Sequence, residues 1–187
     1  MNRQLLSKKK QALRKCADET NMWIRPIEKN DIPAIATIEK ICFTDPWNES
    51  MLADMVNNNF DETFVLEDAA HHVASDTSTA TIKSADGKAS DIIGYVNIRT
   101  LADESELMRI CIIPEKRGYG FSKLIMERAI IAAKVKKAEK VFLEVRESNE
   151  AAINLYSRYN FKEISKRPDY YSSPTEAAVV MQLTLPS

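Results

Sequence analysis

The sequence predicts an α/β domain in which helices flank one β-sheet. Strand-like and helix-like segments alternate along most of the 187 residues, an order typical of mixed α/β domains. The hydrophobic content of 44% is enough for one full core, and a chain of this length fits a single domain. We detect no internal repeat, which excludes repeat architectures.

The first predicted elements are one strand and two helices. The segment "MWIRPI", which begins at Met22, is strand-like, and Asn30 or Asp31 can cap the helix that follows it. Pro46 breaks this helix within "FTDPWNES", and Asn48 can cap a second helix. The two helices therefore meet at an aromatic elbow that contains a proline.

Three strands are predicted in the middle of the chain. "TFVLE" and "IIGYVNIRT" are rich in β-branched and aromatic residues. Between them, residues 69–91 are rich in Ser, Thr, Ala and Asp without periodicity, so we interpret them as a long hairpin loop. "ELMRICIIP" is the third of these strands and ends at Pro114.

The last third of the chain alternates helices and strands. A helix is predicted from about Gly120 to Val135, because apolar residues between Phe121 and Ala132 recur at helical spacing. "KVFLEVR" follows as a strand, "NEAAINLYSRY" as a helix, and "KEISK" and "AAVVMQLTL" as the last two strands. The predicted order is therefore βααβββαβαββ.

The charge of the chain is nearly balanced but unevenly distributed. A net charge of -1 gives no general attraction to nucleic acid. Most of the charged residues in 1–21 are Lys or Arg. We therefore interpret this segment as a basic N-terminal extension of a domain at 22–187. In a eukaryote the same extension would also suit a mitochondrial presequence.

The cysteines indicate where the protein is expected to work. Cys16, Cys42 and Cys111 are widely spaced and form no C-x-x-C pair, so we predict reduced thiols, a cytoplasmic setting and no metal site. The sequence has no run of about 18 apolar residues, so no membrane association is predicted.

Two of the four glycines, Gly118 and Gly120, lie in "PEKRGYGFSKL", where a loop enters a helix. The stretch matches neither common nucleotide motif, since G-x-x-x-x-G-K-(S/T) is absent and Lys123 replaces the third glycine of G-x-G-x-x-G. Free N–H groups and the positive end of the helix dipole favour a phosphate group at such a place. A simple turn would need the same glycines, so these residues alone leave both possibilities open.

Further motifs resemble those of the GNAT superfamily of N-acetyltransferases. "RGYGFS" resembles the loop (Q/R)-x-x-G-x-(G/A), with Arg117, Gly120 and Ser122 at the defining positions, and "NEAAINLYSRYNF" resembles A-x-x-L-Y-x-x-x-G-F. Within the superfamily, "FTDPWNESM", "LEVRESNEAAINLY" and "PDYY" resemble the RimI-type ribosomal-protein-alanine N-acetyltransferases. The likeness covers nearly all of 22–185. Two residues depart from these motifs. Ser122 stands where the loop motif usually has Gly or Ala, and Asn160 stands where the second motif usually has Gly.

The resemblance implies the GNAT fold and a binding site for acetyl-CoA, without a metal. This fold is a single mixed, mostly antiparallel sheet that is splayed in the middle, here between "LMRICII" and "VFLEVR". Gly120 holds the position that the loop motif requires, and we interpret Gly118 as a permissive neighbour. The residues implied to bind the cofactor are Ile110, Cys111 and Ile112 through their backbone, Arg117, Gly118, Tyr119, Gly120, Phe121, Ser122 and Lys123 in the loop, and Asn149.

The reaction benefits from a general base. The pKa of an α-amine is about 7.7 to 8.0, so at neutral pH most of it is protonated and cannot attack a thioester. Glu144 shares one strand face with Phe142 and Arg146, where it could be a solvated carboxylate. The resemblance implies that Glu144 is instead the base, acting directly or through a water molecule.

Tyr156 is the candidate general acid. It shares a helical face with Leu155 and Tyr159, which by itself predicts a core aromatic residue. The resemblance implies that its hydroxyl also donates a proton to the leaving thiolate, and both roles can hold. A phenol with a pKa of about 10 is a plausible acid for a thiolate of about 8.5.

Cys111 could in principle carry the acetyl group in a two-step reaction. The two histidines, His71 and His72, lie in the predicted loop and are not placed to activate it. We therefore predict a packed thiol at Cys111 and direct attack of the amine on the thioester. The lack of placed histidines also argues against a Ser-His-Asp hydrolase.

The candidate substrate residues come from two separate segments. Phe43, Pro46 and Trp47 lie on the elbow, and Tyr170 and Tyr171 on a loop late in the chain. We expect these two segments to flank the peptide entrance, although Trp47 could equally be a core anchor.

The resemblance implies acetylation of the α-amine of a protein N-terminus, with an alanine-starting small-subunit ribosomal protein as the favoured partner. One alternative is broader acetylation of N-termini, lysines or small amines. Another is a CoA-binding or ribosome-binding module without catalysis, against which the presence of both Glu144 and Tyr156 argues. No feature of the sequence indicates the oligomeric state.

Overall fold

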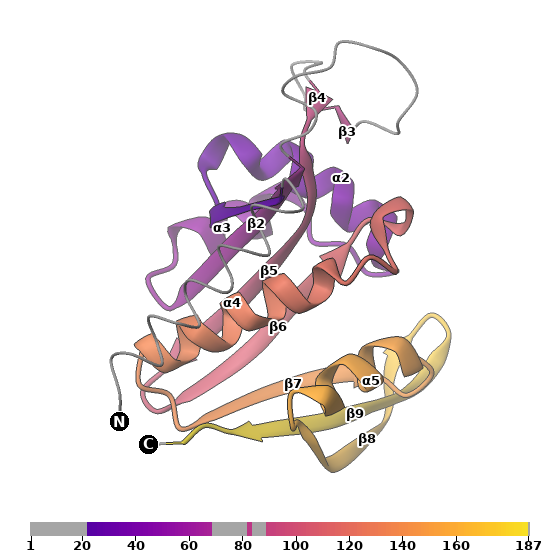
Figure 1. Cartoon of the computed structure of the whole chain (residues 1–187). Helices are drawn as coiled ribbons and strands as arrows, with labels where there is room; N and C mark the ends of the chain where they lie inside the picture. The colour runs from indigo at the N-terminus through magenta and orange to yellow at the C-terminus, as the bar shows by residue number, and fades with distance from the viewer. Residues whose placement is uncertain (1–21, 69–81, 84–88, 187) are drawn as a thin grey trace.

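A computed structural model describes residues 22–68, 82–83 and 89–186. A seven-stranded mixed sheet in the order β1-β2-β5-β6-β7-β9-β8 forms its centre (Figure 1). The elements are β1 Met22–Pro26, η1 Lys29–Asp31, α2 Ile32–Cys42, α3 Glu49–Asn57, β2 Asp61–Asp68, β3 Ile82–Lys83, β4 Ala89–Ser90, β5 Ile92–Leu101, β6 Glu104–Ile112, η3 Pro114–Lys116, α4 Phe121–Val135, β7 Lys140–Arg146, α5 Glu150–Arg158, β8 Lys162–Ser172 and β9 Thr175–Thr184.

The predicted order of helices and strands is confirmed, with two 3-10 helices, η1 and η3, and two short strands added. Two short strands, β3 and β4, pair with each other within the predicted hairpin loop, in a register that places Ile82 opposite Ser90. The rest of that loop, including His71 and His72, lies outside the described residues. The basic extension at 1–21 also lies outside them.

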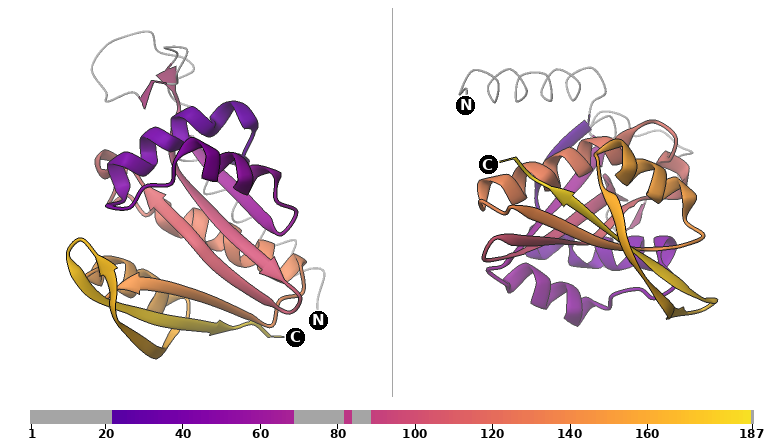
Figure 2. Two further views of the ribbon diagram at one scale, coloured as in Figure 1. Left: turned by 180° about the vertical axis from the view of Figure 1, so that it is seen from behind. Right: turned by 90° about the horizontal axis from the view of Figure 1, so that it is seen from below.

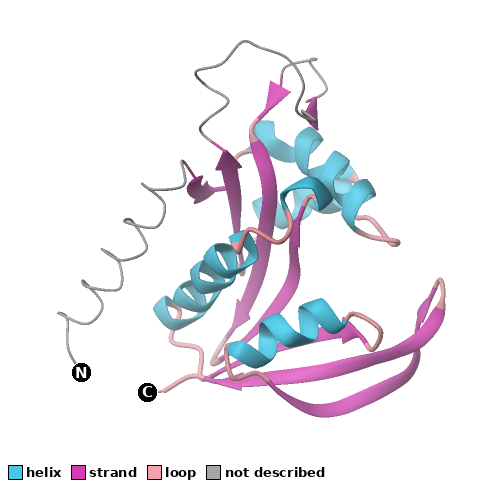
Figure 3. Cartoon of the chain, turned by 45° about the vertical axis from the view of Figure 1, so that its right-hand side comes forward, coloured by secondary structure: helices cyan, strands magenta, loops and turns pink. Residues whose placement is uncertain are grey.

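Helices cover both faces of the sheet. The helix α4 packs on β2, β5 and β6, while α2 packs on β5 and α3 on β2 from the opposite face (Figure 2). Figure 3 shows α5 on the same side of the sheet as α4. Because both faces are covered, the buried residues of the central strands are consecutive, at 63–66 in β2 and 92–98 in β5.

The strand β7 shows the alternation that the sequence predicts. Val141, Leu143 and Val145 are buried, and the residues between them are partly exposed. One face of β7 thus joins the core, and the other face, with Glu144 and Arg146, remains available for chemistry. Within the described part of the chain, no helix has both the length and the apolar character needed to cross a membrane.

The predicted helix caps are correct at one helix and wrong at the other. Asn48 caps α3, since its side chain accepts a hydrogen bond from the Met51 amide at 3.0 Å. Asp31 occupies the N-cap position of α2, but its carboxylate makes no capping bond to that helix. It accepts instead from the Glu28 amide at 2.7 Å and from the Arg25 guanidinium.

The expectation of a loop at Tyr170 and Tyr171 is wrong. Both residues lie on β8, which continues through Pro168 to Ser172. β8 is the edge strand of the sheet, and its pairing with β9 shifts register between Arg167 and Tyr171. Edge strands and bulges tolerate a residue that lacks an N–H group, so Pro168 does not end this strand.

Candidate active site

The sheet separates between β6 and β7, its single parallel pair among the described strands. These strands pair only over Glu104–Glu106 and Lys140–Phe142. Beyond this short ladder, β6 pairs with β5 alone and β7 with β9 alone, and Figure 1 shows the two strands diverging. The predicted splay is therefore confirmed, and the facing edges of β6 and β7 carry backbone groups without a strand partner.

A β-bulge lies where the separation begins. Asn97 of β5 pairs with Arg109, but the next residue, Ile98, pairs with Leu107. Met108 is thus an extra residue in β6, and such a bulge bends and twists a strand locally. The bend follows the end of the β6–β7 ladder, so it helps to turn β6 away from β7.

The end of β6 is held close to β5 by a glycine. A Cβ atom on Gly94 would lie 2.4 Å from the carbonyl oxygen of Cys111 and 2.6 Å from Ile112 Cδ1. Only glycine permits this approach of the two strands. The position of Cys111 and Ile112, both nominated for cofactor binding, therefore depends on a residue that sequence reasoning did not single out.

Both glycines of the loop before α4 have a left-handed backbone. The φ angle is +87° at Gly118 and +85° at Gly120, and no atom lies within 4 Å of the place where a Cβ would be. Their conformation, and not a lack of space, requires glycine here. The interpretation of Gly118 as merely permissive is wrong, because it adopts the same strained region as Gly120.

The loop also presents a run of free amides. The N–H groups of Lys116, Arg117 and Lys123 donate to backbone oxygens. Those of the residues between them, 118–122, donate to no acceptor in the described part of the chain. Unpaired amides at the start of a helix, together with the helix dipole, form a binding site for phosphate groups.

Arg117 braces this loop against the end of β6. Its Nε atom donates to the carbonyl oxygen of Ile112 at 2.9 Å, and the Cys42 thiol approaches the same oxygen at 3.7 Å. A hydrogen bond with Cys111, opposed by burial and aided by the charge of Arg117, lowers the pKa of Cys42 to about 7. Burial raises the pKa of Cys111, which agrees with a packed thiol there.

Glu144 lies at one end of a series of contacts between five side chains, which we call the Glu144 ring. Its carboxylate accepts a hydrogen bond from Arg167, whose guanidinium lies 4.4 Å from the centre of the Tyr170 ring. Tyr170 meets Tyr171 edge to face at 5.1 Å, and Tyr171 lies 4.2 Å below the guanidinium of Arg146. The two ends of this series of contacts, Arg146 and Glu144, share one face of β7.

The charge of Glu144 influences the acids around it. Hydrogen bonding to Glu144, together with burial, raises the pKa of Tyr170, and burial with the same negative charge raises the pKa of Tyr171. Burial and the charge of Glu144 also raise the pKa of Glu106, the last β6 residue paired with β7. Tyr170, Tyr171 and Glu106 therefore remain neutral more readily beside the Glu144 carboxylate.

Tyr156 is both a packed ring and a free hydroxyl. Its side chain is 6% exposed, and its ring lies 5.9 Å from that of Phe161. The hydroxyl makes no hydrogen bond with any described residue. It is also not one of the buried polar atoms without a partner, so it is not fully enclosed by protein. Burial raises the pKa of Tyr156, so the phenol stays protonated near neutral pH but is a weaker acid than a solvated phenol.

Asn149 has a structural role that the sequence did not predict. It is the N-cap of α5, and its side-chain oxygen accepts a hydrogen bond from the Ala152 amide at 3.1 Å. Capping alone explains an asparagine at this position, so its contact with a cofactor stays a prediction.

The elbow between α2 and α3 is built around Arg109 of β6. The Arg109 guanidinium lies 4.6 Å from the ring centres of both Phe43 and Trp47 and donates to the Asp45 carbonyl oxygen at 3.0 Å. Phe43 and Trp47 are partly buried, and Pro46 is exposed beside them. Trp47 therefore anchors the elbow, and its role in substrate contact stays a prediction.

A buried carboxylate fixes the elbow from below. Glu39 of α2 is fully buried and accepts hydrogen bonds from the Trp47 amide at 2.6 Å and from the Tyr95 hydroxyl. Burial raises the pKa of Glu39, although these two hydrogen bonds and the charge of Arg109 oppose the change. One carboxylate thus connects α2, the elbow and β5.

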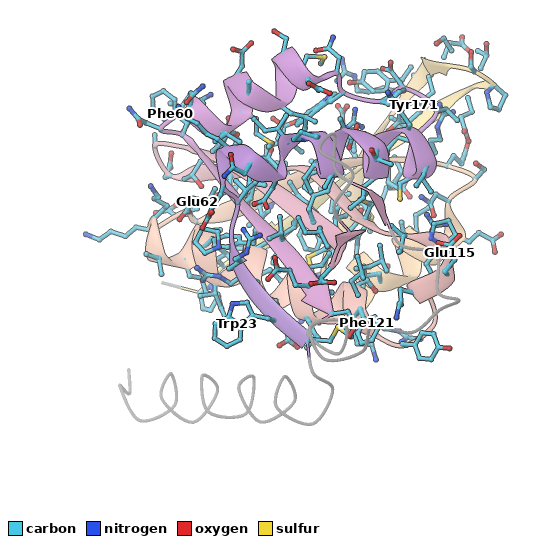
Figure 4. The ribbon with its side chains drawn as sticks, turned by 90° about the horizontal axis from the view of Figure 1, so that it is seen from above. Trp23, Phe60, Glu62, Glu115, Phe121 and Tyr171 are labelled. Atoms are coloured by element: carbon cyan, nitrogen blue, oxygen red, sulfur yellow. The ribbon has the colours of Figure 1, made fainter. Side chains whose placement is uncertain are left out.

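The nominated residues fall into two groups on different sides of the splay. Figure 4 shows Phe121, at the start of α4, and Tyr171, on β8, on opposite sides of the sheet. The loop residues 117–123 lie with Phe121. Glu144 and the elbow lie with Tyr171, since Arg146 contacts both Tyr171 and Thr44 of the elbow.

Sequence reasoning missed several polar residues of the site. Glu39 had the clearest signal, because it is a charged residue between isoleucines of an apolar helix face. The others lie on strands and have partners far away in the chain, so no local pattern marks them. They are Tyr95, Glu106, Arg109, Arg146 and Arg167.

Comparisons with known proteins agree with this geometry. Residues 32–161 match the model of the acetyltransferase (GNAT) family. Over 144 residues the chain is 34% identical to the ribosomal protein bS18-alanine N-acetyltransferase of Haemophilus influenzae, a match that covers 71% of this chain and 97% of that protein.

Solved structures show the same fold. The crystal structure of the ribosomal-protein-S18-alanine N-acetyltransferase from Escherichia coli has a TM-score of 0.71 and 25% identity, over 89% of this chain and 95% of that one. Arabidopsis thaliana NAA60 in complex with acetyl-CoA has a TM-score of 0.72 at 16% identity, over 88% and 98%. The family match, the Haemophilus influenzae relative at 34% identity and the splayed sheet together show that the chain belongs to the GNAT family of acetyltransferases.

Proposed function

We propose that this acetyltransferase transfers the acetyl group of acetyl-CoA to the N-terminal α-amine of a protein, and that the alanine of ribosomal protein bS18 is its acceptor. One observation carries the proposal: the free amides of the glycine loop and the Glu144 ring flank the same separation of β6 and β7. The names of the relatives support the choice of acceptor.

The residues on one side of the splay fit acetyl-CoA. The amides of 118–122 have no described acceptor, which suits a pyrophosphate. The unpaired edge of β6 at Ile110, Cys111 and Ile112 suits the amide groups of a pantetheine arm. When bound there, acetyl-CoA would supply the thioester that the amine attacks.

Glu144 on the other side, together with Tyr156 of α5 on the side of α4, fits the proton transfers. Glu144 would accept a proton from the α-ammonium, directly or through a water molecule, while Arg167 balances its charge before the amine arrives. The free amine then forms the new N–C bond, and the C–S bond breaks. Glu144 passes this first proton to solvent and then takes the proton that leaves the attacking nitrogen, while Tyr156 donates its phenolic proton to the thiolate and regains one from solvent.

A peptide panel tests the proposal. We would incubate the protein with acetyl-CoA and one of three peptides, starting with Ala, starting with Met, or blocked at the N-terminus with an internal Lys. Released thiol is measured, and mass spectrometry locates the acetyl group. The Ala peptide should react fastest, at its α-amine. Faster acetylation of the lysine peptide, or no thiol release with any peptide, would exclude the proposed acceptor.

A further inference from the structure

Arg146 fastens the turn between β8 and β9 to β7. Its Nη1 atom donates to Glu176 Oε1 at 2.7 Å and to the Pro174 carbonyl oxygen at 3.2 Å. Its Nη2 atom approaches the Ser173 carbonyl oxygen at 3.4 Å, and its guanidinium lies over the Tyr171 ring. A single side chain therefore holds one wall of the acceptor side, residues 170–176, which we call the hairpin wall.

The same guanidinium reaches the elbow. Arg146 Nη2 also donates to the Thr44 hydroxyl at 3.0 Å, across 102 positions of sequence. Thr44 lies between Phe43 and Trp47, the two rings that enclose Arg109. Arg146 thus connects the hairpin wall with the opposite wall, residues 43–47, which we call the elbow wall.

The orientation of Arg146 is fixed from behind. Glu176 accepts from Arg146 with one carboxylate oxygen and from the Ser148 amide with the other, at 3.1 Å. The Arg146 and Glu176 side chains are only 20% and 15% exposed. The planar guanidinium is therefore held by several partners at once, a geometry for which lysine is no substitute.

The hairpin wall has little other support. Nearly every residue of β8 is exposed, and its pairing with β9 is interrupted between Arg167 and Tyr171. Arg146 and Glu144 share one face of β7, so the two walls that Arg146 joins lie beside the candidate base. The distance between the walls then decides how firmly an acceptor is held near the base.

We propose that Arg146 is a positioning residue for the acceptor, which sets the separation of the elbow wall and the hairpin wall through its bond to Thr44. The proposal rests on the function proposed above, because it assumes that the acceptor enters between these walls. It concerns the acceptor side alone, so the binding of acetyl-CoA should not depend on it.

A pair of substitutions at Thr44 tests the proposal. Thr44→Val removes the hydroxyl but keeps the branched shape, and Thr44→Ser keeps the hydroxyl as the matched control. Thr44 is exposed, so neither change should prevent folding. Hydrogen bonds to charged groups are substantial but weaker when exposed, so Thr44→Val should raise the KM for the Ala peptide about threefold to tenfold. The KM for acetyl-CoA should stay unchanged in both variants.

Hydrogen–deuterium exchange gives a readout that needs no acceptor. In the free protein, Thr44→Val and Arg146→Lys should both speed amide exchange in segments 43–48 and 172–176, while Thr44→Ser should resemble the wild type. If both segments respond but no peptide is acetylated, the proposed function fails and the connection stands. Equal exchange and equal peptide KM for Thr44→Val and Thr44→Ser would overturn the proposal, as would an equal rise in the KM for acetyl-CoA.

Discussion

The two sides of the splayed sheet are built from different parts of the chain. On the side of α4, the site consists of backbone: free amides at 118–122, two left-handed glycines and the unpaired edge of β6. On the side of the elbow it consists of side chains, namely the Glu144 ring and Arg109 with the two elbow rings that it contacts. The first side suits a cofactor whose phosphate groups are the same in every reaction. On the second side, the side chains can be changed to fit a particular acceptor.

This difference teaches where specificity can change. A backbone site depends on the fold and on a few glycines, so most substitutions leave it intact. A wall of side chains held by Arg146, Arg167 and Glu39 can be altered one residue at a time. We therefore expect substitutions to separate cofactor affinity from acceptor turnover.

Glu144→Gln should have the largest effect and only on turnover. Glutamine can still accept the Arg167 hydrogen bond, but it cannot remove a proton, so kcat should fall about 100-fold or more. The affinity for CoA, measured by calorimetry, should stay within about twofold. Glu147→Gln is the control, because Glu147 lies on the adjacent loop and pairs with Lys166. If Glu144→Gln abolished CoA binding, Glu144 would be structural.

Tyr156→Phe should lower kcat about 10- to 100-fold, because only the proton donor is removed. The ring would still pack against Phe161, so the melting temperature should hardly change. Tyr159→Phe provides the contrast, since the Tyr159 hydroxyl donates to the Lys123 carbonyl oxygen and to Glu127. It should cost stability and leave kcat near the wild-type value. A full rate for Tyr156→Phe in steady-state assays would remove the proposed acid.

Gly118→Ala and Gly120→Ala should weaken the binding of acetyl-CoA. At saturating acetyl-CoA, acetyl transfer should still occur. A side chain at these φ angles costs about 1–2 kcal/mol, so the loop should shift and the Kd should rise about tenfold. Gly94→Ala is a different case, because its Cβ would meet the Cys111 carbonyl oxygen and should lower the melting temperature. Unchanged Kd values in both loop variants would contradict the backbone cradle.

The thiols should show the smallest effect on activity and a defined pH dependence. The lowered pKa of Cys42, about 7, favours the thiolate. In a Cys16→Ser background, alkylation of Cys42 should therefore reach its half-maximal rate near pH 7, with little reaction at buried Cys111. Cys111→Ala should move this midpoint upward and keep kcat within about twofold. Loss of turnover in folded, CoA-binding Cys111→Ala would instead support an acetyl-cysteine intermediate.

The comparison also explains which features the sequence could reveal. The Asn48 cap, the alternation in β7 and the glycine loop each depend on neighbours within a few residues, so a local pattern marks them. The roles of Glu144 and Tyr156 came from the resemblance and not from their surroundings. The structure adds the side chains around each residue, and both catalytic roles stay predictions.

The acceptor side was largely hidden from sequence reasoning. Arg146 and Thr44 are 102 positions apart, and Arg167 and Glu144 are 23 apart. Only the folded sheet brings these side chains together, so no spacing rule identifies them. The loop expected at Tyr170 and Tyr171 was also wrong, because β8 continues through Pro168 at the sheet edge.

A double-substitution cycle between Gly120→Ala and Glu144→Gln tests the separation of the two sides most directly. The Kd for acetyl-CoA would be measured by calorimetry for the wild type, both single variants and the double variant. We predict that Gly120→Ala raises the Kd by the same factor with or without Glu144, while Glu144→Gln alone leaves it unchanged. A Kd that rises as much in Glu144→Gln as in Gly120→Ala would show that the side-chain wall also holds the cofactor, and would contradict this account.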